Sequence, residues 1–171
     1  MMKTVVTTAR YLFLSLFLFS CGTDDSENAE PERGGLGANE VVFSDDNIVC
    51  TPFSSAVTIG EQGILSVIMN PCQNSSSKLD GYFANSGRPA PGTYTIVGTA
   101  GSFPNITTIG AAQFTMIFYN HYTDALYSTS GTVELTVNAD DNSKLDMVWN
   151  EVIMEAGDGY SVEFSGRFIG I

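Results

Sequence analysis

YSVEFSGRFI, residues 160–169, alternates polar and apolar positions from Ser161 to Phe168. One set of alternate positions holds Val162, Phe164, Gly166 and Phe168, and the other set holds Ser161, Glu163, Ser165 and Arg167. A period of two buries one face of a β-strand and leaves the opposite face in water. The stretch therefore predicts a strand that lies against the core of a β-domain.

The preceding stretch, LDMVWNEVIME at residues 145–155, predicts a longer strand with an irregularity near its centre. Trp149 falls on one parity of its apolar positions and Val152 falls on the other, so the inward face switches between them. A β-bulge near Asn150 would produce this switch. We expect Trp149 to be a core residue, and Gly157, Asp158 and Gly159 predict a turn that pairs this strand with the last one.

The rest of the chain predicts further short strands and almost no helix. Residues 114–119 are apolar on both faces except for Thr115, which is typical of a central strand covered on both sides. The remaining candidate strands are residues 56–59, 64–69, 79–84, 93–97, 126–129 and 133–137, with turn signals between them. About eight or nine short strands predict an all-β fold, an antiparallel β-sandwich or barrel.

The chain begins with a short apolar segment of the kind found in exported proteins. Lys3 and Arg10 precede an apolar run at residues 11–19, and Ser20 and Cys21 follow it. The run is too short to cross a bilayer, the positive residues suit the cytoplasmic side, and a small residue suits a cleavage site. The segment therefore predicts a signal peptide at residues 1–20.

The end of this segment, Leu18, Phe19, Ser20 and Cys21, resembles the lipobox of bacterial lipoprotein signal peptides. Phe19 departs from the pattern, because the lipobox usually has a small or branched residue there. The resemblance implies that Cys21 becomes the acylated first residue of the mature chain. It also implies stable anchoring in a membrane through more than one acyl chain of the palmitate type, since each buried methylene contributes about 0.8 kcal/mol. The alternative is an ordinary secretory signal that is cleaved to give a soluble protein.

Residues 21–46 have the composition of a flexible, disordered tether. They hold eight acidic residues against Arg33, together with Pro31 and several glycines. Such a segment cannot bury a core, and its self-repulsion extends it. The early acidic residues resemble the surface-export signals of some Gram-negative lipoproteins, and Gly22 differs from the aspartate of inner-membrane retention. We therefore expect an outer-membrane location in the bacterial cell envelope with surface exposure, against the alternative of a linker that carries no address.

The charge and length of the chain limit its partners and its domain count. The formal net charge is −12, which makes nucleic acid and anionic lipid headgroups poor partners. About 125 residues remain at 47–171 after the predicted tether, which is the size of one domain with its own core.

Cys50 and Cys72 are the thiols that remain in the predicted domain. An exported protein keeps its disulfides, so we predict a bridge between these two residues, with free buried thiols as the alternative. Two cysteines and His121, the single histidine, show no metal-ligand spacing. We expect neither a metal site nor a cofactor.

Four residues form a candidate binding patch: Tyr119, His121, Tyr122 and Tyr127. Tyrosine and histidine rings that also hydrogen-bond could stack on a sugar ring or on a protein partner. The alternative is that the tyrosines pack against the sheet with their hydroxyls in water. His121 lies in no sequence motif that supplies a nucleophile or a metal, so no catalytic residue is assigned.

Two classes of function follow. The first is a lipid-anchored envelope protein whose non-catalytic β-domain binds a protein or polysaccharide, or has a structural role. The second is an envelope hydrolase whose active site uses His121 or carboxylates scattered along the chain, namely Asp80, Glu134, Glu151 and Glu163.

Overall fold

The computed structural model describes residues 36–171 except 46–48, 55–56, 73–74, 85–86, 103–104 and 122–123, and it leaves the side chains of 71, 72, 75, 76, 120 and 121 undescribed. The predicted signal peptide, with Cys21, lies outside the described residues. The strands are β1 (Glu40–Phe43), β2 (Val49–Cys50), β3 (Ile64–Cys72), β4 (Ser75–Phe83), β5 (Gly92–Ile96), β6 (Gln113–His121), β7 (Asp124–Ser130), β8 (Thr132–Val137), β9 (Leu145–Glu155) and β10 (Ser161–Phe168). In the described part of the chain, one 3-10 helix, η1, spans Ile106–Thr108. The predicted all-β fold is confirmed.

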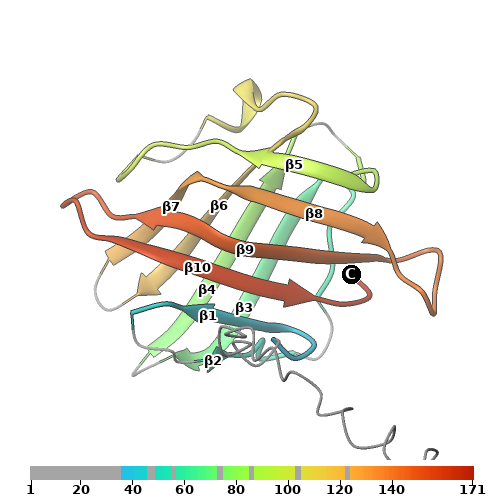
Figure 1. Ribbon diagram of the computed structural model, residues 1–171, viewed down its shortest axis with the longest axis horizontal. Coiled ribbons are helices and arrows are strands. Elements are labelled where there is room, and N and C mark those ends of the chain that lie inside the picture. Colours follow the sequence, from blue (N-terminus) through green and yellow to red (C-terminus); the bar gives the residue numbers. More distant parts are fainter. Residues whose placement is uncertain are drawn as a thin grey trace, which may run out of the picture. The chain divides into compact units, whose positions relative to one another are not determined.

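The strands follow one another in a ring. Their order is β2-β1-β10-β9-β8-β5-β6-β4-β3, and β7 pairs with both β6 and β9. The segment after β2 closes the ring on β3, because Pro52 pairs with Met69 and the Phe53 amide donates to the Ile68 carbonyl over 2.7 Å. In Figure 1, strands β5, β8, β9 and β10 run across the front and β3, β4 and β6 cross behind them at a wide angle. The core lies between these two groups of strands.

The expected antiparallel pairing holds for every described strand pair except β5 with β6. These two strands run parallel, with Thr95 opposite Gln113 and Ile96 opposite Phe114. A parallel pair needs a crossover rather than a tight hairpin, and residues 97–112, which include η1, make that connection. The parallel pairing inserts β5 between β6 and β8, so the sheet is mixed rather than purely antiparallel.

Strand β1 was not predicted, and it lies inside the stretch assigned to the tether. Val41 and Phe43 are 0% and 2% exposed, and the whole strand pairs with β10. The predicted boundary at residue 46 is therefore wrong, and Gly35–Ile171 forms one compact unit. Four residues between acidic neighbours are too few to give a clear alternation, which explains the error.

Aromatic rings fill the centre of the core. Phe43 stacks on Phe164 with ring centroids 4.6 Å apart and meets the edge of Phe118 at 4.9 Å. Trp149 contacts Phe164 at 5.5 Å and Phe168 at 5.3 Å. Trp149 is 1% exposed, so its predicted place in the core is confirmed. Such ring pairs add to the free energy gained from burying their apolar area.

The predicted bulge in β9 is also confirmed. Val152 pairs with Phe164 and Trp149 pairs with Gly166, so two residues of β9, Asn150 and Glu151, stand opposite Ser165 alone. Glu151 has a φ of 51°, and its amide donates to the Ser165 hydroxyl over 2.9 Å. The extra residue lets both halves of a long strand bury their apolar side chains.

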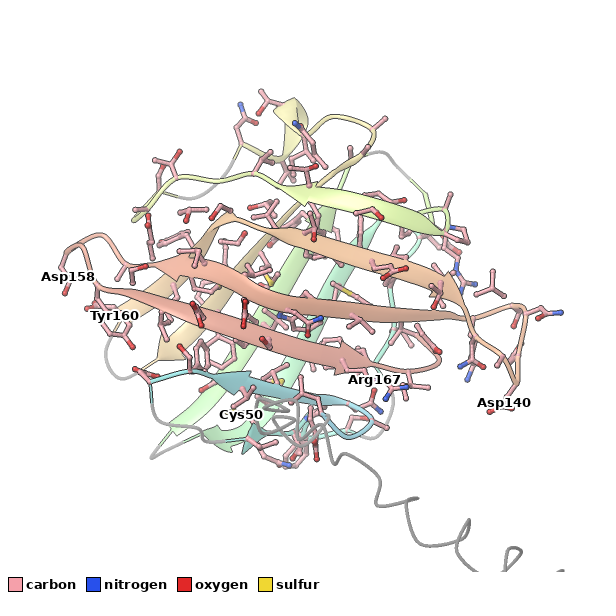
Figure 2. The ribbon with its side chains drawn as sticks, in the orientation of Figure 1. Cys50, Asp140, Asp158, Tyr160 and Arg167 are labelled. Atoms are coloured by element: carbon pink, nitrogen blue, oxygen red, sulfur yellow. The ribbon has the colours of Figure 1, made fainter. Side chains whose placement is uncertain are left out.

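Most of the other predicted strands are found, with boundaries that differ by a few residues. The exception is residues 56–59, where Ile59 makes an isolated bridge to Leu65 and no strand forms among the described residues. The predicted turn near residues 139–143 joins β8 to β9, and that at 157–159 joins β9 to β10. Asp140 and Asp158 mark these two turns at opposite ends of the strands in Figure 2.

Candidate functional site

The outer side of β3, β4, β6 and β7 carries a cluster of polar and aromatic side chains. Alternation along β4 sends Leu79 and Phe83 into the core, so Lys78, Asp80 and Tyr82 lie on the outer side. Strand register aligns the outer residues of neighbouring strands into rows across the sheet. We call the following set the tyrosine face: Ser66, Ile68, Lys78, Asp80, Tyr82, Ile117, Tyr119 and Tyr127.

Two rows make up most of this face. In the first, Asp80 pairs with Ser66 on one side and with Ile117 on the other, and Ile117 pairs in turn with Tyr127. Tyr127 also pairs with Glu155 of β9, which ends the row. The second row contains Ile68, Lys78 and Tyr119 in register on β3, β4 and β6. Facing residues on adjacent strands lie about 5 Å apart, so each row is continuous.

Asp80 is the polar centre of the tyrosine face. It is 5% exposed, and its Oδ1 accepts a 2.7 Å hydrogen bond from the Ser66 hydroxyl. Its Oδ2 lies 2.7 Å from Nζ of Lys78, whose side chain is 46% exposed. A carboxylate this deeply buried is stable only with such partners, so the ion pair balances its charge.

The tyrosines surround this ion pair. Nζ of Lys78 lies 5.8 Å from the centroid of the Tyr119 ring, within the range of a cation–π contact. Tyr82, Tyr119 and Tyr127 are each half-buried. Burial raises the pKa of Tyr82 and of Tyr119 above 10.0, and the negative charge of Asp80 raises both further. Both phenols therefore stay protonated at neutral pH and can donate hydrogen bonds.

The platform beneath these side chains is packed on both sides. Thr115 and Ile117 of β6 lie on the outer side, yet they are 1% and 0% exposed. The prediction that residues 114–119 form a central strand covered on both sides is thus confirmed. The outer side chains consequently stand on a rigid part of the sheet.

The exposed apolar residue Phe53 extends the second row beyond Ile68, which is also exposed. Phe53 is 77% exposed and Ile68 is 60% exposed. Because the Phe53 amide donates to the Ile68 carbonyl, Phe53 stands next to Ile68 across the ring closure. The row then runs Phe53, Ile68, Lys78, Tyr119, with an apolar end and a polar aromatic end.

The structure brings together two residues of the predicted patch. Tyr119 and Tyr127 lie on neighbouring strands, close enough for Tyr127 to contribute to the raised pKa of Tyr119. The side chain of His121 and the whole of Tyr122 lie outside the described residues, although the His121 backbone pairs with Asp124. Sequence reasoning missed Ser66, Lys78 and Tyr82 as site residues. The spacing of residues 78, 80 and 82 on one parity was the available signal.

The carboxylates of the hydrolase hypothesis are spread over the sheet. Asp80 is on β4, which pairs with β3 and β6. Glu134 is on β8, Glu151 on β9 and Glu163 on β10, in the group of strands that crosses in front of β4 in Figure 1. The strand positions therefore do not assemble these glutamates around Asp80.

Cys50 is disulfide-bonded. It lies on β2 and is labelled in Figure 2. The backbone ladder of Pro52 with Met69, continued by the bond from the Asn70 amide to the Thr51 carbonyl, carries Cys50 toward the end of β3, where Cys72 lies. The side chain of Cys72 is outside the described part of the chain, so the pairing of Cys50 with Cys72 stays a prediction.

Comparisons with known proteins give no relative for this fold and face. No protein-family model, no curated protein and no solved structure matches the chain significantly. Among the described residues, no helix has the length and apolar character that a membrane crossing requires.

Proposed function

We propose that the chain is a lipid-anchored envelope protein whose β-domain binds an envelope partner through the tyrosine face and carries out no chemistry itself. The observation that carries the binding proposal is the continuous outer cluster of half-buried tyrosines around the Asp80–Lys78 ion pair. Aromatic rings on a rigid platform, with polar groups among them, are characteristic of binding surfaces.

The anchor is proposed from the N-terminal sequence. A short apolar run after two positive residues, followed by Cys21, supports acylation of that cysteine and an outer-membrane location. In Cys21→Ala, the chain should lose the acyl groups and the lipoprotein cleavage, whereas the unchanged chain should partition with membranes. Mass spectrometry of the mature N-terminus and detergent-phase partitioning measure both effects. Recovery of the unchanged protein without acyl groups in the soluble periplasmic fraction would refute the anchor.

The binding role can be tested by site-specific photocrosslinking in living cells. A photoreactive amino acid at position 68 places the probe on the tyrosine face, and one at position 137 places it at a similarly exposed apolar residue of β8. We expect an envelope component to crosslink at position 68 and not at Val137. Equal crosslinking at the two positions, or none at either, would contradict the proposal.

The hydrolase hypothesis has less support on this face. Asp80 is 5% exposed, and its two oxygens accept hydrogen bonds from Ser66 and from Lys78, so little of the carboxylate is open to a substrate or a water molecule.

A further inference from the structure

The tyrosine face combines apolar ring surfaces with hydrogen-bonding groups at close spacing. The ammonium of Lys78 has three donor hydrogens and one described acceptor, Asp80, and the side chain is nearly half exposed. Ser66 is exposed and shares Asp80 with Lys78. The ligand chemistry that matches such a face has flat C–H surfaces to lie on rings and hydroxyl groups at its edges.

The charge of the face disfavours ionic ligands of either sign. Lys78 already occupies the position over Tyr119 that a cationic ligand would take, and its charge is balanced by Asp80. Glu155 ends the first row, and the whole chain carries a net charge of −12, so an anionic ligand would be repelled. A neutral polyhydroxylated ligand meets neither obstacle.

The backbone of the same strands disfavours recognition of a peptide by strand addition. Strand β4 pairs with β3 on one side and β6 on the other. The far side of β3 is bonded to residues 51–53 through Phe53 and Asn70, and to Ile59 through Leu65. No described edge of β3 or β4 is therefore left open along this face for a peptide to extend.

The length of the second row suits a chain of linked rings. It crosses four neighbouring segments of the sheet, from Phe53 through Ile68 and Lys78 to Tyr119. With strands about 4.8 Å apart, the row extends about 14 Å, which is room for about three pyranose rings. We propose, on the basis of the binding role above, that the partner of the tyrosine face is a neutral polysaccharide laid across these strands.

Binding of defined oligosaccharides to the full-length mature lipoprotein in detergent tests this inference. The probes are maltohexaose, cellohexaose and mannohexaose as neutral chains, and an oligogalacturonate as the acidic chain. Lys78→Met and Tyr119→Ala change the face, and Lys144→Met is the matched control, because it removes the same charge at the β8–β9 turn. Thermal melting of each variant shows whether it folds. If Lys78→Met does not fold, Tyr119→Ala serves as the test in its place.

We expect at least one neutral hexasaccharide to bind the unchanged protein and Lys144→Met equally. Lys78→Met should weaken that binding about tenfold, the effect of losing a charge-assisted hydrogen bond. Tighter binding of oligogalacturonate than of the neutral chains would overturn the inference. If no oligosaccharide binds but position 68 crosslinks to a protein, the saccharide inference fails and the binding role survives. If neither occurs, both fail.

Discussion

At the scale of single residues, the contact between Gly166 and Trp149 sets a strict packing requirement in the core. Gly166 of β10 lies against the Trp149 ring, and a Cβ at this position would overlap Cζ2 of the indole. Trp149 is fully enclosed by Phe164, Phe168 and the opposite strands, so it cannot move aside freely. The missing side chain at residue 166 is thus a packing requirement rather than a turn signal.

Gly166→Ala should therefore lower the free energy of unfolding by about 1–3 kcal/mol through overpacking. Gly87→Ala is the matched control, because a Cβ there meets no atom within 4 Å, and it should change stability little. Chemical denaturation of both variants measures the difference. Equal stability of the two variants would show that the Trp149 ring moves without cost.

The tyrosine face should also be visible in a pH titration. Burial and the charge of Asp80 raise the pKa of Tyr82 and Tyr119 above 10.0, the value of a free tyrosine. The folded state holds these two protons more tightly than the unfolded state does. The contribution of the two tyrosines to the free energy of unfolding is therefore fully present below pH 10 and is lost as pH rises through their folded pKa values. Ultraviolet phenolate absorbance should show that Tyr82 and Tyr119 ionise at a higher pH than free tyrosine. In Asp80→Asn, the midpoint of this ionisation should move closer to 10.0. An unchanged titration in Asp80→Asn would contradict the role of its charge.

At the scale of elements, β2 is two residues long and depends on its covalent and neighbouring contacts. Cys50 is 3% exposed and disulfide-bonded there, beside the segment that closes the ring. If Cys72 is its partner, the bridge closes a loop of roughly twenty residues, which stabilises the fold by about 3 kcal/mol in the chain-entropy model. Reduction should lower the melting temperature by several degrees. With or without reductant, Cys50→Ala should melt at the temperature of the reduced unchanged protein. If reduction does not shift the melting temperature of the unchanged protein, a stabilising bridge is excluded.

Periodicity predicted the elements whose pattern is long enough to be distinctive. The alternation at residues 161–168 and the parity switch around Asn150 are both found as strand and bulge. β1 and β2 were missed because four and two residues show no clear period. The parallel pairing of β5 with β6 could not be predicted, because it depends on where residues 97–112 return in space.

Distance along the sequence also decided which residues of the candidate site could be predicted. Tyr119 and Tyr127 were found because they are close in the sequence, and hairpin pairing brings them together. Ser66, by contrast, meets Asp80 through the register of β3 with β4. Register is a property of a strand pair, so a single strand's pattern predicts which face a residue takes but not which neighbour it gains.

At the scale of the whole molecule, the ring is closed unequally around its circumference. Strands β9 and β10 share a long ladder, whereas residues 51–53 are bonded to β3 by few pairs. Local opening should therefore begin at this closure. In hydrogen exchange, the amides of Phe53 and Asn70 should be less protected than that of Met154, and reduction of the Cys50 disulfide should widen the difference. Equal protection would mean that the ring opens only by global unfolding.

The alternation of Lys78, Asp80 and Tyr82 with Leu79 and Phe83 has a consequence for how such a protein can change. Along β4 the odd positions 79 and 83 fill the core, and the even positions 78, 80 and 82 lie on the outer side of the sheet. The exposed members of the outer set can vary while the inner set stays constant, so the chemistry of this surface can change without loss of the fold. A library that randomises Ile68, Tyr119 and Tyr127, and keeps Asp80 with its partners Ser66 and Lys78, should for that reason yield mostly folded proteins with altered outer surfaces.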